Sequence, residues 1–119
     1  MAPLFSIVTP VYDPPVDVLK ETIASVQGQS FGDWEWILVD DASPNPDVLA
    51  ELRGAEAGDE RIRVVARADN GHIVKASNDG IAAATGEFIV LLDHDDLLTG
   101  DALERVAEAS AAQPAAHIF

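Results

Sequence analysis

An acidic cluster follows the most apolar run of the sequence. Asp93-His94-Asp95-Asp96 comes directly after the apolar residues Phe88 to Leu92. Two carboxylates two residues apart at the end of a buried strand are poorly explained by solvation alone. Packed like charges repel one another, so such a cluster suggests a cation that neutralises it, and oxygen ligands suit Mg²⁺ or Mn²⁺. His94 is a candidate ligand, although a histidine between two acids in a loop is more often solvated or hydrogen-bonded.

Acidic residues also follow the other apolar runs. Asp13 comes after the first run, Asp40 and Asp41 after the second, and Asp69 after the third. In an open parallel sheet, ligands bind outside the carboxyl ends of the strands, so these acids are expected to converge on one edge. Taken singly, Asp13, Asp41, Asp69 and Asp96 are each better explained as a helix cap or a turn residue than as a ligand.

The elements that position these acids are visible as alternating patterns. Val16, Leu19, Ile23 and Val26 recur at helical spacing, and Gly28 is expected to end that helix. Strands are predicted at 5–9, 34–39, 61–66 and 88–92, with the start of a fifth at 115–119. Helices are predicted at 16–27, 46–53, 72–85 and 101–112, with a loop at 54–60.

The alternation of strands and helices predicts an α/β fold, a Rossmann-like and mostly parallel sheet with helices on both faces. The run 88–92 is apolar at every position, as in a central strand covered on both faces, whereas 61–66 alternates as near a sheet edge. Small residues in 72–85 predict close packing of that helix. The paired Trp34 and Trp36 are expected in the core.

The composition limits which classes of protein this chain can belong to. With 119 residues, the chain is expected to form one domain, residues 1–119. Its 7 Lys+Arg against 21 Asp+Glu give a net charge of −14, which disfavours nucleic acid and anionic membranes as partners. The absence of cysteine excludes disulfides and thiol chemistry. No apolar run approaches the roughly 18 residues of a membrane-spanning helix, and a cytoplasmic protein is expected.

Several ligand-binding motifs are missing from the sequence. No Gly-x-Gly-x-x-Gly follows the first apolar run and no Gly-x-x-x-x-Gly-Lys occurs, which disfavours the usual dinucleotide and phosphate loops. The sequence pattern of a calcium-binding loop is matched in part, by Asp93, Asp95 and Glu104. Leu97 and Leu98 stand where that pattern needs an oxygen ligand and a glycine, so a calcium loop is not expected. No serine lies in a Gly-x-Ser-x-Gly context, which disfavours one class of hydrolase.

Four segments stand out, in this order: Ser6-Ile7-Val8-Thr9-Pro10-Val11-Tyr12-Asp13, Trp36-Ile37-Leu38-Val39-Asp40-Asp41-Ala42-Ser43, Asn70-Gly71-His72-Ile73 with Ala76-Ser77-Asn78, and Thr85-Gly86-Glu87-Phe88-Ile89-Val90-Leu91-Leu92-Asp93-His94-Asp95-Asp96. Together they resemble the nucleotide-sugar-binding half of family 2 glycosyltransferases with the GT-A fold. The resemblance covers essentially the whole chain. Four motifs in the right order make a specific signal, whereas an Asp-x-Asp alone would be weak.

The resemblance implies a role for each matching residue. Asp40 would accept a hydrogen bond from the nucleoside base, Asp93 would contact the ribose or the metal shell, and Asp95 would coordinate Mn²⁺ or Mg²⁺. Asn78 would lie in the helix that faces the diphosphate. The implied nucleotide-sugar site comprises Pro10, Val11, Tyr12, Asp13, Asp40, Asn78, Asp93, His94 and Asp95.

One position departs from the family pattern. Where the family commonly carries Ala-Arg-Asn, this chain has Ala76-Ser77-Asn78, so one cationic contact to the diphosphate is missing. Lys75 either substitutes for that contact or is a solvated helix lysine.

The implied activity is metal-dependent, inverting transfer of a hexosyl unit from a nucleotide-diphosphate sugar. The acceptor would be a glycan, a lipid-linked glycan or a protein, as in cell-envelope polysaccharide synthesis, with a full-length protein that is cytoplasmic or membrane-peripheral. The general base comes, in this family, from the second half of the domain, so we expect it beyond Phe119. The chain is then expected to be an incomplete, donor-binding half that binds a nucleotide sugar and turns it over poorly.

Two other interpretations remain open from the sequence. A non-catalytic module would keep the fold and bind a nucleotide sugar or a partner without turnover. A receiver-like signalling domain has a similar length and an acidic pocket, but it needs a lysine after the fifth strand, and the lysines here are Lys20 and Lys75. An exposed sheet edge at Ile118-Phe119 would favour self-association.

Overall fold

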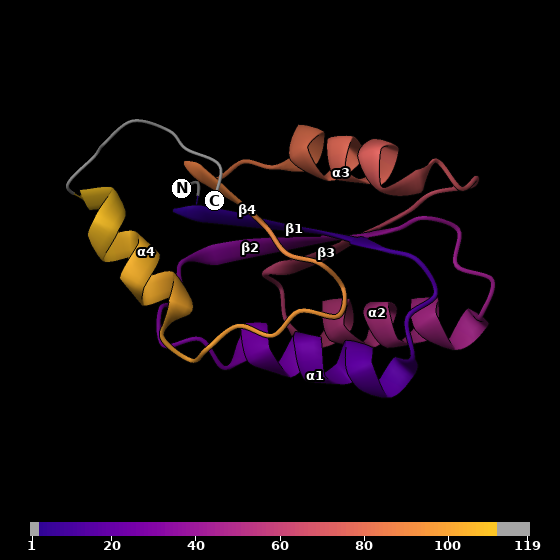
Figure 1. Cartoon of the computed structure of the whole chain (residues 1–119), viewed down its shortest axis with the longest axis horizontal. Coiled ribbons are helices and arrows are strands. Elements are labelled where there is room, and N and C mark those ends of the chain that lie inside the picture. The colour runs from indigo at the N-terminus through magenta and orange to yellow at the C-terminus, as the bar shows by residue number, and fades with distance from the viewer. Residues whose placement is uncertain (1–2, 112–119) are drawn as a thin grey trace.

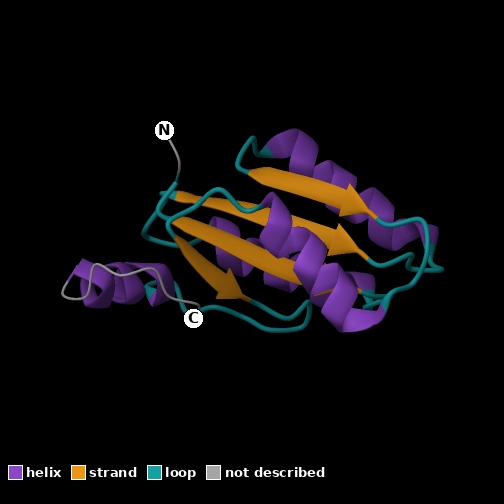
Figure 2. Ribbon diagram, turned by 90° about the horizontal axis from the view of Figure 1, so that it is seen from above, coloured by secondary structure: helices purple, strands orange, loops and turns teal. Residues whose placement is uncertain are grey.

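Four parallel strands form one sheet in the order β3-β2-β1-β4. The computed structural model describes residues 3–111 of the chain. Each strand is short, and each ends at the same edge of the sheet, where the connecting loops gather (Figure 2). The strands are β1 (Phe5–Val11), β2 (Trp34–Asp40), β3 (Ile62–Ala66) and β4 (Phe88–Leu91).

Helices cover both faces of this sheet, so the predicted α/β fold is confirmed. In Figure 1, α1 and α2 lie below the sheet and α3 lies above it, while α4 lies beyond the end at which the strands begin. The helices are α1 (Val16–Gln27), α2 (Pro46–Gly58), α3 (His72–Ala83) and α4 (Ala102–Ala111). Within residues 3–111, none of them has the length and apolarity needed to cross a bilayer.

The larger apolar core lies between the sheet and the α1–α2 layer. Leu19, Ile23 and Val26 of α1 are buried there, as their helical spacing predicts. Trp36 is fully buried in the same core, and its indole Nε1 donates to the hydroxyl oxygen of Thr9 at 2.8 Å. This hydrogen bond removes the cost of burying the indole N–H without a partner.

The opposite face of the sheet is covered by α3 through small side chains. Ala76 packs against Val8 and Val39, and a Cβ placed on Gly80 would lie 2.4 Å from Val8 Cγ1. Glycine is therefore required at position 80 by the close approach of the helix to the sheet. The predicted close packing of this helix is confirmed, and it brings the first turn of α3 near the ends of β1 and β2.

Strand β1 runs through Pro10 to Val11, so the prediction that it ends before Pro10 is wrong. Val8 accepts a hydrogen bond from Leu92 N at 3.0 Å, and Val11 accepts one from Asp41 N at 2.8 Å. Pro10 lies two residues after Val8, so its nitrogen faces the same side of the strand, toward β4. Pairing between β1 and β4 ends at Val8. A proline that cannot donate is tolerated at that position because no ladder bond is required there.

Helix α2 is longer than predicted, and the loop predicted at 54–60 is wrong over its first residues. The helix continues to Gly58. Glu56 accepts a hydrogen bond from Val64 N at 2.7 Å and pairs with Arg53 at 3.0 Å, which ties the last turns of the helix to β3. A Cβ added at position 54 would have no neighbour within 4 Å, so Gly54 is a solvent-facing helical residue.

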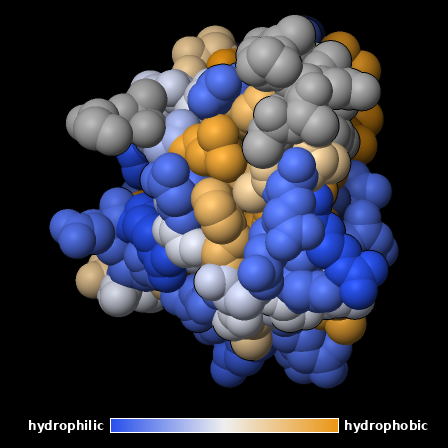
Figure 3. Space-filling model, turned by 90° about the vertical axis from the view of Figure 1, so that its left-hand side faces the viewer, coloured by the Kyte–Doolittle hydropathy of each residue, from blue (hydrophilic) through white to orange (hydrophobic). Residues whose placement is uncertain are grey.

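Strand β4 is an edge strand of the sheet formed by residues 3–111, not the predicted central strand. Phe88 and Val90 are buried, but Leu91 is 46% exposed. Strand β3 lies at the other edge, as its alternating sequence predicts. The predicted strand at 115–119, with the edge at Ile118-Phe119, lies outside the described residues. Figure 3 shows the end of the molecule at which the strands begin, where hydrophobic residues gather centrally among hydrophilic ones.

Candidate functional site

A cavity of about 620 Å³ opens at the carboxyl ends of the strands. This is the edge at which open parallel sheets bind ligands, and the volume is that of a small-molecule site. The walls come from the ends of β1 and β2, the start of α3 and the loop after β4. The lining residues are Pro10, Val11, Tyr12, Asp41, Asn70, His72, Ile73, Ala76, Asp93, His94 and Asp95.

Apolar surface on the cavity walls is unusually accessible. Tyr12 is 49% exposed and Ile73 is 59% exposed, although both are large hydrophobic side chains. Exposed aromatic and aliphatic surface inside a concave site provides area on which a flat ring can pack. The cavity therefore combines apolar packing surface with a small number of polar groups.

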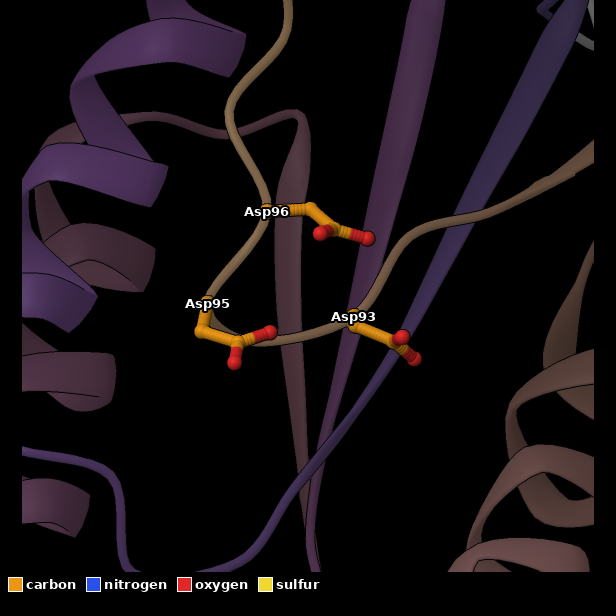
Figure 4. Close-up of side chains that lie close together, drawn as sticks. All are labelled: Asp93, Asp95 and Asp96. Atoms are coloured by element: carbon orange, nitrogen blue, oxygen red, sulfur yellow. The ribbon is translucent and has the colours of Figure 1, made fainter.

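The acidic groups in the cavity wall come from one loop. Carboxylate oxygens of Asp93, Asp95 and Asp96 lie within 4.8 Å of one another, and all three residues are exposed. Figure 4 shows the side chains of Asp95 and Asp96 extending to the side of the loop on which Asp93 lies. A turn closed by Asp96 N and Asp93 O at 3.1 Å brings them together.

These carboxylates fit a divalent cation. They offer only oxygen ligands, the donor type that Mg²⁺ and Mn²⁺ prefer. Within residues 3–111, none of the three forms an ion pair with Lys or Arg. Their exposure leaves room for water and phosphate oxygens to complete the coordination sphere.

Asp40 and Asp41 are adjacent in sequence but occupy different environments. Asp40 is 4% exposed, and its carboxylate accepts hydrogen bonds from the hydroxyl of Ser43 at 2.6 Å and from Ser43 N at 3.3 Å. Asp41 is 2% exposed and lines the cavity. Asp41, but not Asp40, is thus among the residues that line the cavity.

A partly buried ion pair holds Asp41 in place. Its Oδ1 accepts hydrogen bonds from Arg67 Nε at 2.9 Å and from Gly71 N at 2.9 Å. Arg67 also pairs with Asp79 of α3. Through these contacts the ends of β2 and β3 and the start of α3 form one connected wall of the cavity.

The backbone around the cavity contains three non-glycine residues in the left-handed region. Asp13, Ala42 and His72 have φ of 48°, 59° and 63°. Asp13 is fixed there because its N–H donates to Ser43 Oγ at 2.8 Å and its carboxylate accepts from Asn45 N at 3.1 Å. Backbone conformations of this kind cost energy and are typical of functional sites.

The structure brings most of the sequence-predicted residues together. Pro10, Val11, Tyr12, Asp93, His94 and Asp95 line the cavity, whereas Asp13, Asp40 and Asn78 are not among the lining residues. Asn78 is exposed on α3. It lies about 200° around the helix from Ala76, which faces the cavity, because each residue turns the helix by about 100°.

Other lining residues were not assigned from the sequence. They are Asp41, Asn70, His72, Ile73 and Ala76. The signal that could have found them is the start of the helix at His72, preceded by Asn70-Gly71, because the first turn of a helix after a strand faces the ligand-binding edge. Asn70 accepts a hydrogen bond from His72 N at 2.9 Å, which shapes that turn.

Comparison with known families agrees with this geometry. The model of glycosyl transferase family 2 matches residues 6–119. The chain belongs to glycosyltransferase family 2. This membership sets aside the receiver-like alternative and agrees with the resemblance drawn from the four sequence motifs.

Known proteins are similar to this family 2 chain in sequence or in fold. The O-antigen biosynthesis protein RfbC of Myxococcus xanthus is 46% identical over 112 residues, 94% of this chain and 9% of that protein. TarS 1-349 of S. aureus has a TM-score of 0.84 at 25% identity, covering 96% of this chain and 33% of that one.

A mannosyltransferase, PcManGT from Pyrobaculum calidifontis in complex with GDP-Man and Mn²⁺, has a TM-score of 0.81 at 22% identity, covering 93% of this chain and 33% of that one. Its likeness shows the fold. The parallel sheet with helices on both faces is therefore that of GT-A glycosyltransferases. The family 2 chain spans a third or less of the length of these relatives.

Proposed function

We propose that the cavity binds the nucleoside diphosphate of a nucleotide-sugar donor. On this proposal the chain is the donor-binding half of a metal-dependent, inverting glycosyltransferase of the hexosyl type. Family membership supports the class of reaction. The single observation that carries the assignment of the site is the cluster of exposed carboxylates beside an apolar cavity wall.

Asp93 and Asp95 are the proposed cation ligands, with Asp96 completing the acidic cluster. Mn²⁺ or Mg²⁺ bound there would neutralise the charge that develops on the departing nucleoside diphosphate. The carboxylates would also hold the cation at the edge of a strongly acidic chain, which would otherwise repel a diphosphate. PcManGT, which shares the fold, is described in complex with Mn²⁺ and GDP-Man.

The nucleoside base is proposed to lie against Tyr12, with Ile73 on the opposite side. Asp41 replaces Asp40 as the proposed acceptor of a base N–H, because Asp41 lines the cavity while Ser43 hydrogen-bonds to Asp40. The Oδ1 of Asp41 is held by Arg67 and Gly71. This restraint would keep the carboxylate oriented without the base.

The diphosphate is proposed to lie between the acidic cluster and the first turn of α3. Asn70 and His72 line that part of the cavity. The N-terminus of a helix carries unpaired backbone N–H groups and a partial positive charge, which favour a phosphate. The helix would thereby supply part of the positive potential that the missing Ala-Arg-Asn arginine would otherwise provide.

The acceptor is proposed to be a glycan, a lipid-linked glycan or a protein hydroxyl. RfbC, a relative, is named for O-antigen biosynthesis, which agrees with a cell-envelope polysaccharide. The general base is expected from a part of the protein beyond this chain, since the chain spans a third or less of the relatives it matches.

Calorimetry tests the proposal. UDP, GDP and dTDP are titrated into the chain in buffer with Mn²⁺ and, separately, with EDTA. We expect one nucleotide to bind at least about tenfold more tightly with Mn²⁺. Absence of binding by all three, or equal affinity in EDTA, contradicts the proposal. Binding without transfer to any acceptor would be expected of this half alone.

A further inference from the structure

The loop that carries the acidic cluster has no regular secondary structure. This loop, called here the acidic loop (residues 92–101), connects β4 to α4. Its two ends are fixed by apolar burial, since Leu92 is 5% exposed and Leu103, just beyond the loop, is 1% exposed. Between those ends the exposed carboxylates repel one another. Other contacts must therefore hold the loop in shape.

Most of the side-chain contacts to the loop come from one face of α1 and from Gln29, just after that helix. Thr22 is fully buried, and its hydroxyl donates to the carbonyl oxygen of His94 at 2.9 Å. His94 lies between Asp93 and Asp95, so this hydrogen bond fixes the centre of the Asp-x-Asp turn. The distance from the same hydroxyl to Val18 O within the helix is longer, at 3.3 Å.

Two further polar side chains, Ser25 of α1 and Gln29 just beyond its C-cap, hold the rest of the acidic loop. Ser25 Oγ accepts a hydrogen bond from Leu98 N at 3.3 Å. Gln29 Nε2 donates to Thr99 O at 2.6 Å, and Gln29 Oε1 accepts from Leu103 N at 3.0 Å. The loop contributes only backbone groups to these contacts.

Thr22 and Ser25 of α1, together with Gln29 just after the helix, are called here the α1 stripe. Thr22 and Ser25 lie on the same face of the helix because they are three residues apart, and Gln29 extends this line of polar side chains past the end of α1. Because the stripe bonds to backbone N–H and C=O groups, it does not engage the side chains of Asp93 and Asp95, which line the cavity. Outside the stripe, the loop accepts a hydrogen bond from Tyr12 N at His94 Nδ1, at 3.4 Å. Its backbone bonds at the two ends to Val8 O through Leu92 N and to Ser30 N through Gly100 O.

We infer that the α1 stripe is the positioning device of the cation site and that Thr22 is its principal positioning residue. This inference rests on the proposed function, since it takes Asp93 and Asp95 as the cation ligands. Thr22 contacts neither the cation nor the donor; it acts through the His94 carbonyl. Residues that orient metal ligands from behind typically change metal affinity by about 10- to 100-fold when they are removed.

Three variants of the chain test the inference. Thr22→Val removes the donor and keeps the shape of the side chain, while Thr22→Ser keeps the donor. Thr9→Val is the matched control, because Thr9 is equally buried and accepts one buried hydrogen bond, from Trp36, outside the cavity. Mn²⁺ affinity is measured by electron paramagnetic resonance, and amide hydrogen exchange is followed at Asp96.

We expect Thr22→Val to weaken Mn²⁺ binding about tenfold or more and to speed exchange at Asp96. Thr22→Ser and Thr9→Val should stay within about twofold of the parent in Mn²⁺ affinity, although Thr9→Val lowers global stability. Parent-like affinity and exchange in Thr22→Val overturn the inference. Equal weakening by Thr22→Val and Thr9→Val overturns it too, because the effect would then be general destabilisation.

Failure of the proposed function gives a different result. A parent chain that binds no Mn²⁺ contradicts the cation site itself. In that case amide exchange at Asp96 tests only whether the α1 stripe positions the loop, independently of any cation. Faster exchange in Thr22→Val than in Thr9→Val supports the positioning of the loop, and equal exchange overturns it.

Discussion

At the end of the sheet where the strands begin, the carboxylate of Glu35 accepts hydrogen bonds from Ser6 Oγ at 2.5 Å and from Thr85 N at 2.6 Å, and pairs with Arg63 at 3.0 Å. At the opposite end, the carboxylates of Asp93 and Asp95 are exposed, and within residues 3–111 neither forms an ion pair with Lys or Arg. The carboxylate of Glu35 is thus satisfied by hydrogen-bond donors and a cation, whereas those of Asp93 and Asp95 are accessible to solvent.

The backbone differs between the two ends in the same sense. The left-handed non-glycine residues of the described chain all lie at the cavity end: Asp13 and Ala42 in connections after β1 and β2, and His72 as the first residue of α3. Repelling carboxylates and left-handed backbone both reduce the stability of the fold. Their concentration at one edge agrees with the ligand site proposed there, whereas the carboxylate at the other end is satisfied by hydrogen bonds.

The largest expected effect is that of Asp95→Asn on Mn²⁺ binding. Removal of a direct ligand should weaken Mn²⁺ affinity by more than about 100-fold, the upper end of what indirect contacts contribute. The free energy of unfolding without metal should be unchanged or slightly higher, because a repelling charge is removed. Electron paramagnetic resonance and urea unfolding measure the two quantities.

The matched control for that variant is Asp69→Asn. Asp69 is exposed at the same edge but does not line the cavity, so this change alters the net charge equally. It should leave Mn²⁺ affinity within about twofold, since distant exposed charges are screened. Equal losses in the two variants would attribute the effect to net charge and contradict the assigned ligand.

The next largest effect is expected at the other end. Glu35→Ala leaves the donors of Ser6, Thr85 and Arg63 without their shared acceptor and should lower the free energy of unfolding by about 2 kcal/mol. Nucleotide affinity should not change. Glu108→Ala, an exposed glutamate on α4, should change stability by less than about 0.5 kcal/mol. A Glu35 variant as stable as the parent would show that this end is no more optimised than the cavity end.

A pH series separates the charge of Glu35 from its packing. Burial raises the pKa of Glu35, but hydrogen bonds from Ser6 and Thr85 and the charge of Arg63 outweigh it and hold the pKa below its ordinary value of 4.5. A carboxylate with a depressed pKa stabilises the fold above its unfolded pKa, and this stability is lost as pH falls through the folded pKa.

The expected result is a fall in the unfolding free energy of the parent below about pH 4.5 that is shallower in Glu35→Gln. Urea unfolding between pH 7 and pH 3 measures both slopes. Other carboxylates titrate equally in the two chains, so the difference belongs to Glu35. Parallel slopes would contradict the depressed pKa.

The smallest expected effect concerns the backbone at the cavity end. Ala42 has φ of 59°, which glycine adopts without steric cost, so Ala42→Gly should raise the free energy of unfolding by about 0.5–1 kcal/mol. The same change at Ala50, an exposed residue within α2, should lower it by a similar amount. Destabilisation by Ala42→Gly would show that position 42 carries no strain.

Much of the fold follows from local sequence patterns. The helical spacing of Leu19, Ile23 and Val26 locates α1 because the pattern is set by neighbours in the chain. The end of α2 was misjudged because its last turns are held by Val64, a residue of β3. The position of β4 was misjudged because burial of an apolar run does not specify how many strands flank it.

The acidic loop could be predicted for the same reason, since Asp93 and Asp95 are neighbours in sequence. Which of Asp40 and Asp41 lines the cavity could not be predicted in this way. Arg67 and Gly71, which are 26 and 30 residues away, hold Asp41, and only the folded chain brings them to it. The sequence therefore indicates the edge of the sheet at which the cavity opens, but not which of two adjacent aspartates lines it.

The coupling between cation and nucleotide tests the central claim most directly. The Mn²⁺ dissociation constant is measured with and without the bound nucleotide, and the nucleotide dissociation constant with and without Mn²⁺, after correction for the complex that the two form in solution. If Asp93 and Asp95 hold a cation that contacts the diphosphate, each ligand should strengthen binding of the other by the same factor, at least about tenfold. A factor of one in both directions would place the two ligands at independent sites and contradict the account.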